Sequence, residues 1–442
     1  MADDSSTRFE ASQADQRPVA YIMSRFPKLT ETFVLDELVA VDRQGVRIEL
    51  FPLLRERAEI VHPEALPWIE RAHYLPFLSA AILRSNVRLL VRHPRRYLGT
   101  LAAMIRGTAG SLNFLVGGIG IFPKVVHAAS QMSALGVRHV HCHFATHPAL
   151  AGFLIHRLTG IPYSFTAHGS DLHVERRMLC QKIAESAFAV TISRSNAAVI
   201  AKECGGSVPK LQVIRCGVDL RRFRPADERN ERSYAADPTG VPTGGTADAE
   251  LAATDRPPSI TCIGTLHEVK GQRHLIAALA TLAERDINVC CRFVGDGPDR
   301  AELEGLVDKL GLGGSVEFLG QRMRSDVLEL LAGTDILVAP SVPTSGGKRE
   351  GLPVVLIEAM AAGVPVVASH LSGIPELVEN EVTGLTVPPG DPAAIADALA
   401  RLLADRPLRQ RLARAGRERI ETEYDLDRNA ARLIGLFAGT AA

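Results

Sequence analysis

The sequence lacks the cysteine patterns of disulfide-rich and zinc-binding domains. Its 442 residues include seven cysteines, an odd number with no Cys-x-x-Cys pair, so neither a disulfide framework nor a zinc ribbon is predicted. This cysteine usage fits a reducing cytosol best. Aromatic residues make up only 5% of the chain. With no stacking platform visible, a nucleic-acid binder is the least favoured class.

Long apolar runs are also missing. The longest segment free of charge and of histidine, 107–123, contains five glycines and ends in proline. A membrane-spanning helix needs about 20 apolar residues, so none is predicted. Residues 1–17 are polar and lack the apolar core of a signal peptide, which predicts a disordered tail. The 46% hydrophobic and 23% charged content is that of a globular protein, and the length suggests two domains.

Acidic residues are missing from one long stretch. The chain carries 50 basic and 50 acidic side chains, yet no Asp or Glu lies between Glu70 and Asp171. Ten cations lie in that stretch: Arg71, Arg84, Arg88, Arg92, Arg95, Arg96, Arg106, Lys124, Arg138 and Arg157. Such a stretch favours an anionic partner, for example a phospholipid surface or a pyrophosphate. The alternative is scattered, solvated arginines, because a hundred residues need not form one patch.

Strand-like and helix-like patterns alternate along most of the chain. Residues 19–23 predict a strand, 33–41 a helix and 46–53 a second strand, and the alternation resumes at residue 137. Strand, helix, strand at this spacing predicts a parallel sheet with helices on both faces. Residues 225–258 contain five prolines and have the composition of a linker, after which a second alternating series begins.

We therefore predict an α/β protein with two Rossmann-like, doubly wound domains, 18–220 and 259–420, joined by a linker, 221–258. The last segment, 421–442, is expected to be helical and to return to the first domain. Ligands bind beyond the carboxyl ends of parallel strands. The sequence therefore predicts an active site in the cleft between the domains.

The strongest local signal is a helix preceded by a loop rich in glycine and serine. Pro353 suits the first turn of that helix, which leaves Glu350 in the loop and Glu358 inside the helix. Both carboxylates can then face one ligand, and their oxygens suit the hydroxyl groups of a ribose or a hexose. The amides of Gly351 and Leu352 lie at the positive end of the helix, where phosphate binds well.

Glu350 and Glu358, with seven residues between them and Ala359-Met360-Ala361-Ala362-Gly363 following, resemble the second-domain motif of the family-four retaining glycosyltransferases, which have the GT-B fold. The resemblance runs from Pro18 to about Tyr424, outside the linker. The first loop, 24–33, resembles the exopolysaccharide, colanic-acid-type branch of that family. Further matching segments are Gly264-Thr265-Leu266, Val294-Gly295-Asp296-Gly297-Pro298, Phe318-Leu319-Gly320, Gly373-Ile374-Pro375-Glu376, Thr383-Gly384-Leu385, Thr166-Ala167-His168-Gly169-Ser170-Asp171 and Gly217-Val218-Asp219.

The resemblance implies a donor site in the second domain, which then binds the nucleotide sugar while the first domain binds the acceptor. Glu358 would hold the ribose of the donor, Glu350 the hydroxyls of its sugar, and Lys270 the pyrophosphate. The other residues implied along the donor are Gly351, Leu352, Pro353 and Gln321, the last near the base. Thr265 stands where the family often has an arginine. A second cation must then come from elsewhere, with Arg273 and Arg25 as candidates.

The resemblance also implies residues of the first domain. His168 is expected near the donor sugar and the reaction centre, with a hydrogen-bonded loop histidine as the alternative. Asp171 either belongs to this site or caps the helix that follows. The possible acceptor or phosphate loop contains Arg25, Phe26, Glu31 and Thr32. Thr30 or Thr32 could equally be helix caps, with Glu31 in the first turn.

Several histidines of the first domain invite a metal hypothesis. They are His139, His141, His143 and His147, with Cys142 among them. A metal site is disfavoured because no carboxylate or second cluster completes a ligand set. The expected donor site needs no divalent cation either, since Lys270 and a helix N-terminus neutralise the leaving pyrophosphate.

Taken together, the resemblance implies a retaining hexosyltransferase that acts on a nucleotide diphosphate sugar and an acceptor hydroxyl, in exopolysaccharide, lipopolysaccharide or glycolipid biosynthesis. The basic stretch favours a lipid-linked acceptor and a cytoplasmic enzyme that binds the inner face of the plasma membrane peripherally. Two alternatives stay open: a small soluble acceptor, as in natural-product glycosylation, and an inactive scaffold that only binds sugar nucleotides.

Overall fold

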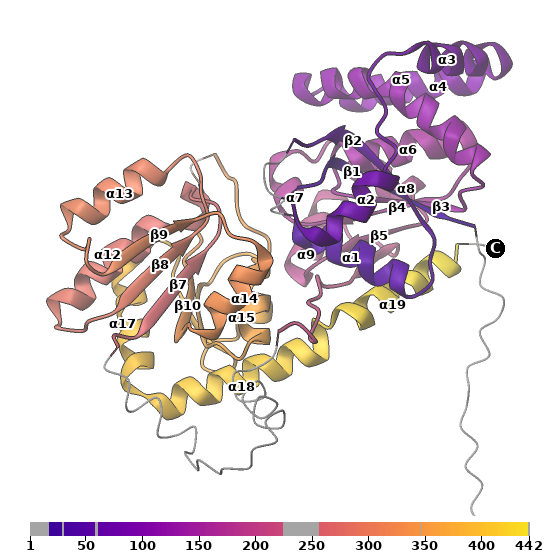
Figure 1. The fold of residues 1–442 in the computed structure, drawn as a ribbon. Coiled ribbons are helices and arrows are strands. Elements are labelled where there is room, and N and C mark those ends of the chain that lie inside the picture. The colour runs from indigo at the N-terminus through magenta and orange to yellow at the C-terminus, as the bar shows by residue number, and fades with distance from the viewer. Residues whose placement is uncertain (1–16, 29–30, 58–60, 224–255, 345, 441–442) are drawn as a thin grey trace, which may run out of the picture.

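The computed structural model describes residues 17–28, 31–57, 61–223, 256–344 and 346–440. Thr30, the expected tail up to residue 16 and most of the expected linker lie outside the described residues. The described chain folds into two α/β units, each built on its own parallel sheet (Figure 1).

Each sheet has six strands, all of them parallel to their neighbours. The first sheet has the order β2-β1-β3-β4-β5-β6 and contains β1 (Val19–Phe26), β2 (Ile48–Arg55), β3 (His139–His143), β4 (Tyr163–Ala167), β5 (Phe188–Thr191) and β6 (Leu211–Val213). The second has the order β12-β11-β10-β7-β8-β9 and contains β7 (Ser259–Ile263), β8 (Cys290–Val294), β9 (Val316–Gly320), β10 (Ile336–Ala339), β11 (Val366–Ser369) and β12 (Leu385–Val387). The predicted pair of doubly wound domains is confirmed.

Helices cover both faces of each sheet. In the first domain they are α1 (Thr32–Arg43), η1 (Pro63–Ala65), α2 (Leu66–Arg71), α3 (Ala80–Arg92), α4 (Pro94–Thr108), α5 (Leu112–Ala134), α6 (His147–Thr159), α7 (Ser170–Val174), α8 (Leu179–Glu185) and α9 (Arg194–Glu203). In the second they are η2 (Glu268–Lys270), α12 (Gln272–Glu284), α13 (Arg300–Lys309), α14 (Arg324–Ala332), α15 (Val354–Ala361), α16 (Ile374–Leu377) and α17 (Pro392–Ala404).

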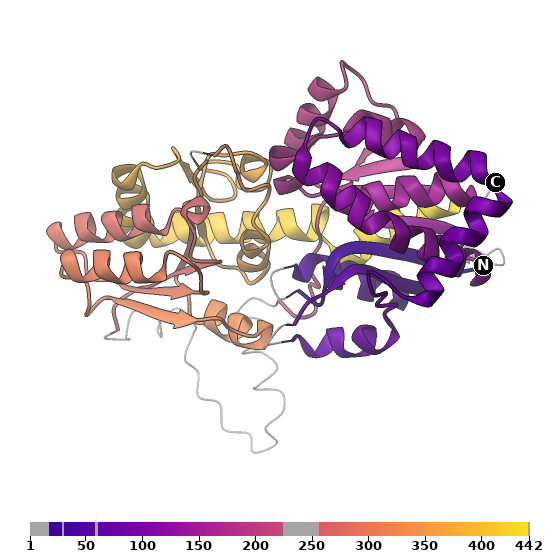
Figure 2. The same ribbon diagram turned by 90° about the horizontal axis from the view of Figure 1, so that it is seen from above.

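Two C-terminal helices link the domains. The helix α18 (Arg406–Glu423) packs against α15, and α19 (Leu426–Ala438) packs against α1 of the first domain. Figures 1 and 2 show this pair running along both domains. An isolated β-bridge from Val218 to Asp425 joins the turn between the two helices to the end of the first domain.

Successive side chains along the strands of the first sheet point to opposite faces, so they belong to two separate hydrophobic cores. On β1, Ala20 and Ile22 join the core under α5 and α6, whereas Tyr21 joins the core under α1 and α19. On β3, Val140 and Cys142 also point toward α5 and α6. Because the period of a strand is two residues, the three histidines of β3 share the opposite face, toward α1 and α19.

A helical insertion between β2 and β3, formed by α3, α4 and α5, was not predicted. Of the described helices, α5 alone is long and apolar enough to cross a membrane, with 44% of its most apolar window buried. Its second half packs into the core of the first domain through residues such as Phe122, Val126 and Met132. Packing against the sheet is therefore a sufficient reason for the apolar character of that half.

The structure also contains one disulfide, which the cysteine count did not predict. It joins Cys180 of α8 to Cys204 at the end of α9. The helices α8 and α9 lie next to each other in the first domain. The odd number and wide spacing of the cysteines gave no sign of this pair, because only the fold brings the two together.

Candidate functional site

The two domains meet where loops at the carboxyl ends of their sheets touch. A Cβ atom on Gly351 would lie 2.5 Å from the carbonyl oxygen of His168, and a Cβ on Gly169 would lie 2.9 Å from the Cα of Gly351. Gly169 also has a φ of 112°, which favours glycine. Two glycines are therefore needed for this close approach of the backbones.

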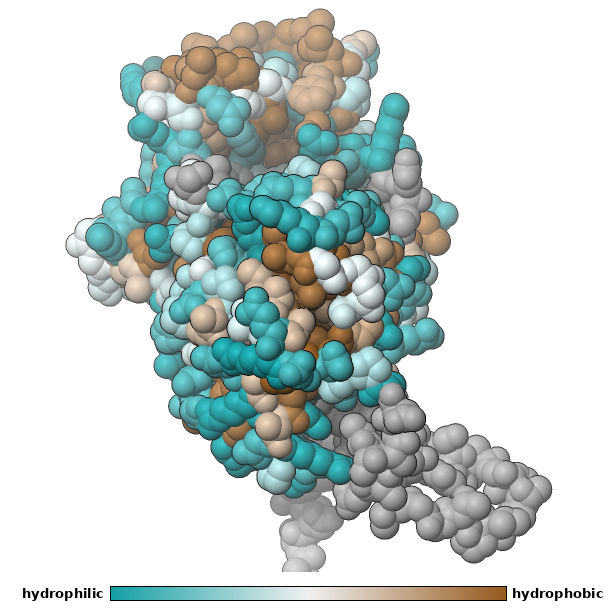
Figure 3. All heavy atoms as spheres, turned by 90° about the vertical axis from the view of Figure 1, so that its left-hand side faces the viewer, coloured by the Kyte–Doolittle hydropathy of each residue, from teal (hydrophilic) through white to brown (hydrophobic). Residues whose placement is uncertain are grey.

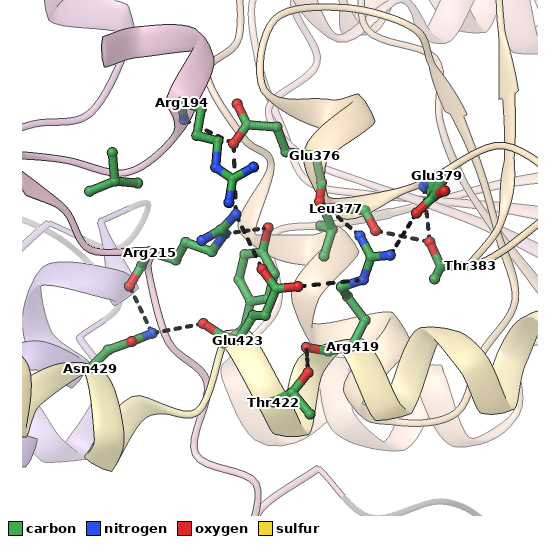
Figure 4. A network of polar contacts seen from close by, with 12 residues as sticks. Arg194, Arg215, Glu376, Leu377, Glu379, Thr383, Arg419, Thr422, Glu423 and Asn429 are labelled. Carbon is green, nitrogen blue, oxygen red and sulfur yellow. Dashed lines mark hydrogen bonds and ion pairs between the residues drawn. The ribbon is translucent and has the colours of Figure 1, made fainter.

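A polar network fixes the domains next to this contact (Figure 4). The carboxylate of Glu376, in α16 of the second domain, accepts hydrogen bonds from the amides of Arg194 and Ser195 at 2.9 and 2.7 Å. These are first-turn amides of α9 in the first domain, where an acidic group is favoured. Arg215 extends the network to Glu423 of α18 at 3.1 Å.

A cavity of about 280 Å³ lies between the domains. The residues that line it are Thr32, Phe33, His62, Ile263, Gly264, Thr265, Lys270, Arg322, Arg324, Val327, Glu350, Leu352, Pro353, Val354, Val355 and Glu358. A second cavity of about 150 Å³ shares Phe33, Glu350, Leu352 and Val354 with the first and adds His168 and Gly351. The fold thus brings most of the expected donor residues to one cleft.

The first charged group of the cleft is a lysine–glutamate pair. Lys270 Nζ lies 2.7 Å from Glu350 Oε1, and the hydroxyl of Ser341 donates to Glu350 Oε2 at 2.9 Å. A Cβ on Gly264 would lie 3.1 Å from Lys270 Cε, so glycine after β7 leaves room for the lysine. The pair holds Glu350 in one place, with its charge balanced by Lys270.

The second charged group surrounds Glu358 in the middle of α15. Burial raises the pKa of Glu358 to about 7, opposed by Arg324 and assisted by Asp36. Arg324 forms an ion pair with Asp36 of α1, and its Nη2 lies 3.8 Å from Glu358 Oε1. Nε and Nη2 of this arginine are buried and have no hydrogen-bond partner among the described residues, so both can donate to an anionic ligand.

The second cation of the cleft is not one of the residues that the sequence suggested. Arg273 pairs with Glu302 at 3.2 Å on the outside of the second domain, and Arg25 pairs with Glu56 at 3.4 Å. Neither residue lines the interdomain cavity. Arg322 and Arg324 line it instead, together with Lys270. The sequence did not indicate these two arginines, because none of the matching motifs includes residues 322–324. In addition, Arg324 is positioned partly by Asp36 of the other domain.

Several residues of the expected first-domain loop lie apart from the cleft. Arg25, Phe26 and Glu31 line a separate, smaller cavity next to β1, and only Thr32 of that group reaches the interdomain cavity. Thr32 is the first residue of α1 rather than its cap; the cap position is Glu31, whose side chain makes no capping bond and pairs with Lys28 instead.

Two further expected residues, Asp171 and Gln321, are not among the lining residues of either interdomain cavity. Asp171 is buried and accepts hydrogen bonds from the amides of Ala145, His168 and Gly169 at 2.6, 3.0 and 2.8 Å. It therefore fixes the loops after β3 and β4 to each other instead of facing a ligand, and burial raises its pKa despite these bonds. Gln321 is exposed and does not line either interdomain cavity.

His168 lines the cleft, and burial lowers its pKa well below the ordinary value, with His143 acting in the same direction. The argument that no carboxylate accompanies the histidines is wrong. Glu37 of α1 lies against the face of β3 that carries them, with Oε1 3.3 Å from His143 Nε2 and 3.8 Å from His141 Nε2. A signal for Glu37 exists in the sequence: it is an acid on the apolar face of a predicted helix, next to Val34 and Leu38.

Comparison with known proteins agrees with this geometry. Residues 246–419 match a family model described as "Glycosyl transferases group 1". The putative colanic acid biosynthesis glycosyltransferase WcaL of Escherichia coli K12 is 32% identical over 229 residues, which cover 51% of this chain and 51% of WcaL. The chain therefore matches about half the length of that relative.

Two further similarities cover more of the chain. The GDP-mannose-dependent alpha-(1-6)-phosphatidylinositol monomannoside mannosyltransferase of Mycobacterium tuberculosis H37Rv is 32% identical over 277 residues, covering 62% of this chain and 67% of that protein. The solved structure of HepE from Anabaena in complex with UDP has a TM-score of 0.67 and 16% identity, covering 96% of this chain and 100% of HepE. At that identity the likeness shows the fold alone.

Proposed function

Because the chain belongs to the group 1 glycosyl transferases, we propose that it transfers a hexosyl unit from a nucleotide diphosphate sugar to an acceptor hydroxyl with retention of anomeric configuration. The product would be an exopolysaccharide, lipopolysaccharide or glycolipid. One observation carries the proposal: Lys270, Glu350 and Glu358 line a single interdomain cavity, so cationic and carboxylate groups face one ligand.

The donor would bind along the second-domain wall of this cavity. Glu358 would accept hydrogen bonds from the ribose hydroxyls, and Glu350 from hydroxyls of the sugar. Lys270 and the two arginines would neutralise the pyrophosphate, together with the first amides of α15, whose N-terminus begins after Pro353. The buried position of Arg324 strengthens its interaction with an anion, because little solvent screens it.

The same groups would lower the barrier of the reaction. Negative charge develops on the departing nucleotide diphosphate, and fixed cations that meet it stabilise the transition state without reorganising. Glu350 is held by Lys270 and Ser341, which suits a hydroxyl ligand. We propose a front-face mechanism in which the departing phosphate takes the proton of the acceptor hydroxyl. Since protein cations supply the positive charge, we expect activity to persist in excess EDTA.

The donor site is tested by calorimetric titration with UDP, GDP, ADP and their hexose conjugates. We expect one nucleotide to bind tightly and Glu358→Ala to weaken it roughly 100-fold, because two charge-assisted hydrogen bonds are lost. Arg324→Ala should weaken it as well, whereas Arg273→Ala and Glu302→Ala, an exposed pair outside the cleft, should not. Binding of no nucleotide by the wild type would favour an inactive scaffold and overturn the proposal.

We further propose that the acceptor is lipid-linked and that α3, α4 and α5 bind an anionic membrane surface. Large apolar side chains on these helices are exposed to solvent, among them Leu83, Val87 and Val91 of α3 and Leu112 and Val116 of α5. The three on α3 are spaced by four residues and thus form one stripe. Figure 3 shows the hydrophobic colour gathered over this part of the molecule.

Positive charge accompanies this apolar surface. Arg84, Arg88 and Arg92 follow the apolar stripe of α3 by one position each, and α4 contributes Arg95, Arg96 and Arg106. In the described part of the chain, none of these six forms an ion pair with an acid. Other cations of the basic stretch do not join this surface: Lys124 of α5 is buried, and Arg157 pairs with Glu185. An apolar stripe beside unpaired arginines suits an anionic lipid headgroup region, at the cytoplasmic face of the plasma membrane.

Flotation with vesicles of phosphatidylglycerol tests the surface. We expect the protein to float with these vesicles at low salt and not with phosphatidylcholine alone, because the arginines need anionic lipid. Replacing Arg84, Arg88 and Arg92 by glutamine should abolish flotation, whereas the same change at Arg411 and Arg414 of α18 should not. If the protein does not float with anionic vesicles at low salt, a small soluble acceptor becomes the better hypothesis.

A further inference from the structure

Phe144, which follows β3, has an unusual backbone conformation for a large side chain. Its φ is 78°, in the left-handed region that bulky residues rarely adopt. Such a conformation is strained and persists only where the surroundings hold it, and residues of this kind cluster at functional sites. Of the described non-glycine residues with positive φ, Phe144 is the one that lines an interdomain cavity.

Two buried charged side chains hold the residue that follows this ring. The amide of Ala145 donates to Asp171 Oδ2 at 2.6 Å, and the carbonyl oxygen of Ala145 accepts a hydrogen bond from Lys182 Nζ. The amide of Phe144 itself donates to the carbonyl oxygen of Thr166 at 2.8 Å. Asp171 and Lys182 come from two further elements, α7 and α8. The short loop after β3 is therefore held from several sides.

The side chain of Lys182 lies entirely inside the first domain. It is 0% exposed, and its Nζ lies 5.2 Å from the centroid of the Phe114 ring. Burial lowers the pKa of Lys182 to about 7, although Asp171 and Glu175 act in the opposite direction. The protonated and the neutral amine both carry hydrogens, so either form donates to Ala145. A buried amine is costly unless it has a hydrogen-bond partner, and here the partner is the backbone of the loop.

Phe144 shares its cavity with Glu350 of the second domain. The hydroxyls around the edge of a hexose suit the carboxylate of Glu350. The C–H groups on the face of the same hexose suit an aromatic ring. One contact of the Phe144 ring is with His168, at 4.8 Å between the ring centroids, yet Phe144 is not fully buried. The part that stays accessible can therefore pack against a sugar ring.

We propose that Lys182 and Asp171 are positioning residues: they hold Ala145 by its carbonyl and its amide, and thereby fix the ring of Phe144 where it packs against the face of a sugar in the cleft. The identity of the ligand rests on the proposed glycosyl transfer, whereas the positioning of Phe144 does not. The strained backbone of Phe144 is the reason why two buried side chains are needed, because an unsupported loop would relax to a more favourable conformation.

The competing explanation is that these bonds serve only the start of α6. That helix begins at His147, and its cap residue Thr146 makes no side-chain capping bond. The amide of Ala149, in the first turn of α6, donates to the carbonyl oxygen of Phe144 at 3.3 Å. If fixing α6 were the whole role, loss of Lys182 would lower stability and leave kcat unchanged. The two explanations therefore differ in their effect on kcat.

Lys124 provides a matched control for Lys182. It is 4% exposed, its Nζ donates to the carbonyl oxygen of Leu53, and the ring of Phe77 lies 5.2 Å away. Burial lowers its pKa to about 8. Lys124 lines neither interdomain cavity. Lys124→Met thus removes the same kind of buried lysine–carbonyl bond at a place that the proposal does not involve.

Hydrogen exchange, measured by mass spectrometry on the full-length protein, tests the positioning without substrate. Lys182→Met should raise the exchange rate of the Phe144 and Ala145 amides about 10-fold, because the loop that carries them is released. Lys124→Met should leave the exchange of these two amides unchanged. Unchanged exchange in Lys182→Met would overturn the positioning role.

Steady-state kinetics test the consequence for transfer. Lys182→Met should lower kcat roughly 10- to 100-fold, because a displacement of about 1 Å in the cleft is enough for such a loss. The affinity for the donor nucleotide should stay within twofold of wild type, since the proposed donor groups lie on the second domain. Phe144→Ala should lower kcat to a similar extent, Phe144→Tyr should retain it, and Lys124→Met should leave it unchanged.

A double variant separates action through Phe144 from a general loss of structure. If Lys182 acts through this ring, Lys182→Met should lower kcat less than twofold further in the Phe144→Ala background. Losses that multiply, or a kcat for Lys182→Met within threefold of wild type, would overturn the proposal. Asp171→Asn, which turns one acceptor oxygen into a donor, is the second variant if Lys182→Met does not fold, and the same results are expected from it. If the wild type turns over no donor, the proposed function fails while hydrogen exchange still decides the positioning.

Discussion

The two walls of the cleft are built on similar sheets. They differ in the charge of the polar groups that face the cleft. The second-domain wall presents charged groups that balance each other, such as Lys270 with Glu350. The first-domain wall presents His168, which burial keeps neutral. An anionic donor needs cations that are already in place, whereas a neutral sugar hydroxyl needs only a correctly oriented acceptor. We infer that the second-domain wall stabilises the charge of the donor, whereas the first-domain wall orients a neutral group of the ligand.

Removing Lys270 from the charged wall should have the largest effect. Lys270→Ala should lower kcat about 100- to 1000-fold, as expected when a fixed group that stabilises developing charge is deleted, and it frees the carboxylate of Glu350. Steady-state kinetics with the identified donor provide the measurement. Lys309→Ala, at an exposed position of α13, is the control. A loss below 10-fold would mean that the arginines carry most of the charge stabilisation.

The contact between the two walls can be broken by a single methyl group. Gly351→Ala places a Cβ 2.5 Å from the carbonyl oxygen of His168, so the two loops must separate. We expect kcat to fall roughly 10- to 100-fold, because a displacement of about 1 Å at the reacting groups is enough for such a loss. Gly346→Ala, whose Cβ would meet nothing closer than 3.9 Å, should retain activity. Equal activity of the two variants would show that the walls need not touch.

The network that fixes the two domains can be weakened outside the cleft. Glu376→Ala removes the acceptor of two first-turn amides of α9, and we expect the free energy of unfolding to fall by about 1–2 kcal/mol. Urea titration measures the change. Glu379→Ala breaks an exposed pair with Arg419 inside the second domain, which should cost under about 1 kcal/mol. The reverse order of the two losses would contradict the role of Glu376 between the domains.

The smallest effect concerns pH. Burial holds the pKa of Glu358 at about 7, so near pH 7 the side chain is protonated in about half of the molecules. Ribose hydroxyls favour the ionised form, and the affinity for a nucleotide sugar should therefore fall, by up to about 10-fold, from pH 8 to pH 6. Binding should release protons, which calorimetry in two buffers measures. Glu358→Gln should remove both effects. The first-domain wall should add no pH dependence here, since the pKa of His168 lies far below this range.

How much of the site could be predicted depends on where its residues lie along the chain. Glu350, Gly351, Leu352, Pro353 and Glu358 lie within nine consecutive positions, so the geometry of one loop and one helix is enough to bring them together. Lys270 and His168 were recognised from motifs and do line the cleft. Each of these residues follows the carboxyl end of a strand, which the alternating pattern already located.

The residues of the site that the sequence did not indicate make contact with partners on distant elements of the chain. Arg324 begins a helix of the second domain, yet its ion pair is with Asp36 of the first. Glu37 is next in sequence to Asp36 but contacts the histidines of β3. No local pattern distinguishes these two acids from solvated ones on a helix surface. Their partners become visible only when α1 is packed between the first sheet and the second domain.

The alternation of strands and helices and the two sheets follow from local patterns, because period and spacing act within one element or its neighbours. The donor residues were instead implied by the resemblance to a known family. Packing between distant elements sets which cations line the cleft, leaves Arg25, Phe26, Glu31, Asp171 and Gln321 outside its lining, and brings Glu37 to His143. The physical reason is that burial and long-range contacts set the charge of a side chain and the direction of its hydrogen bonds, and both depend on residues hundreds of positions apart.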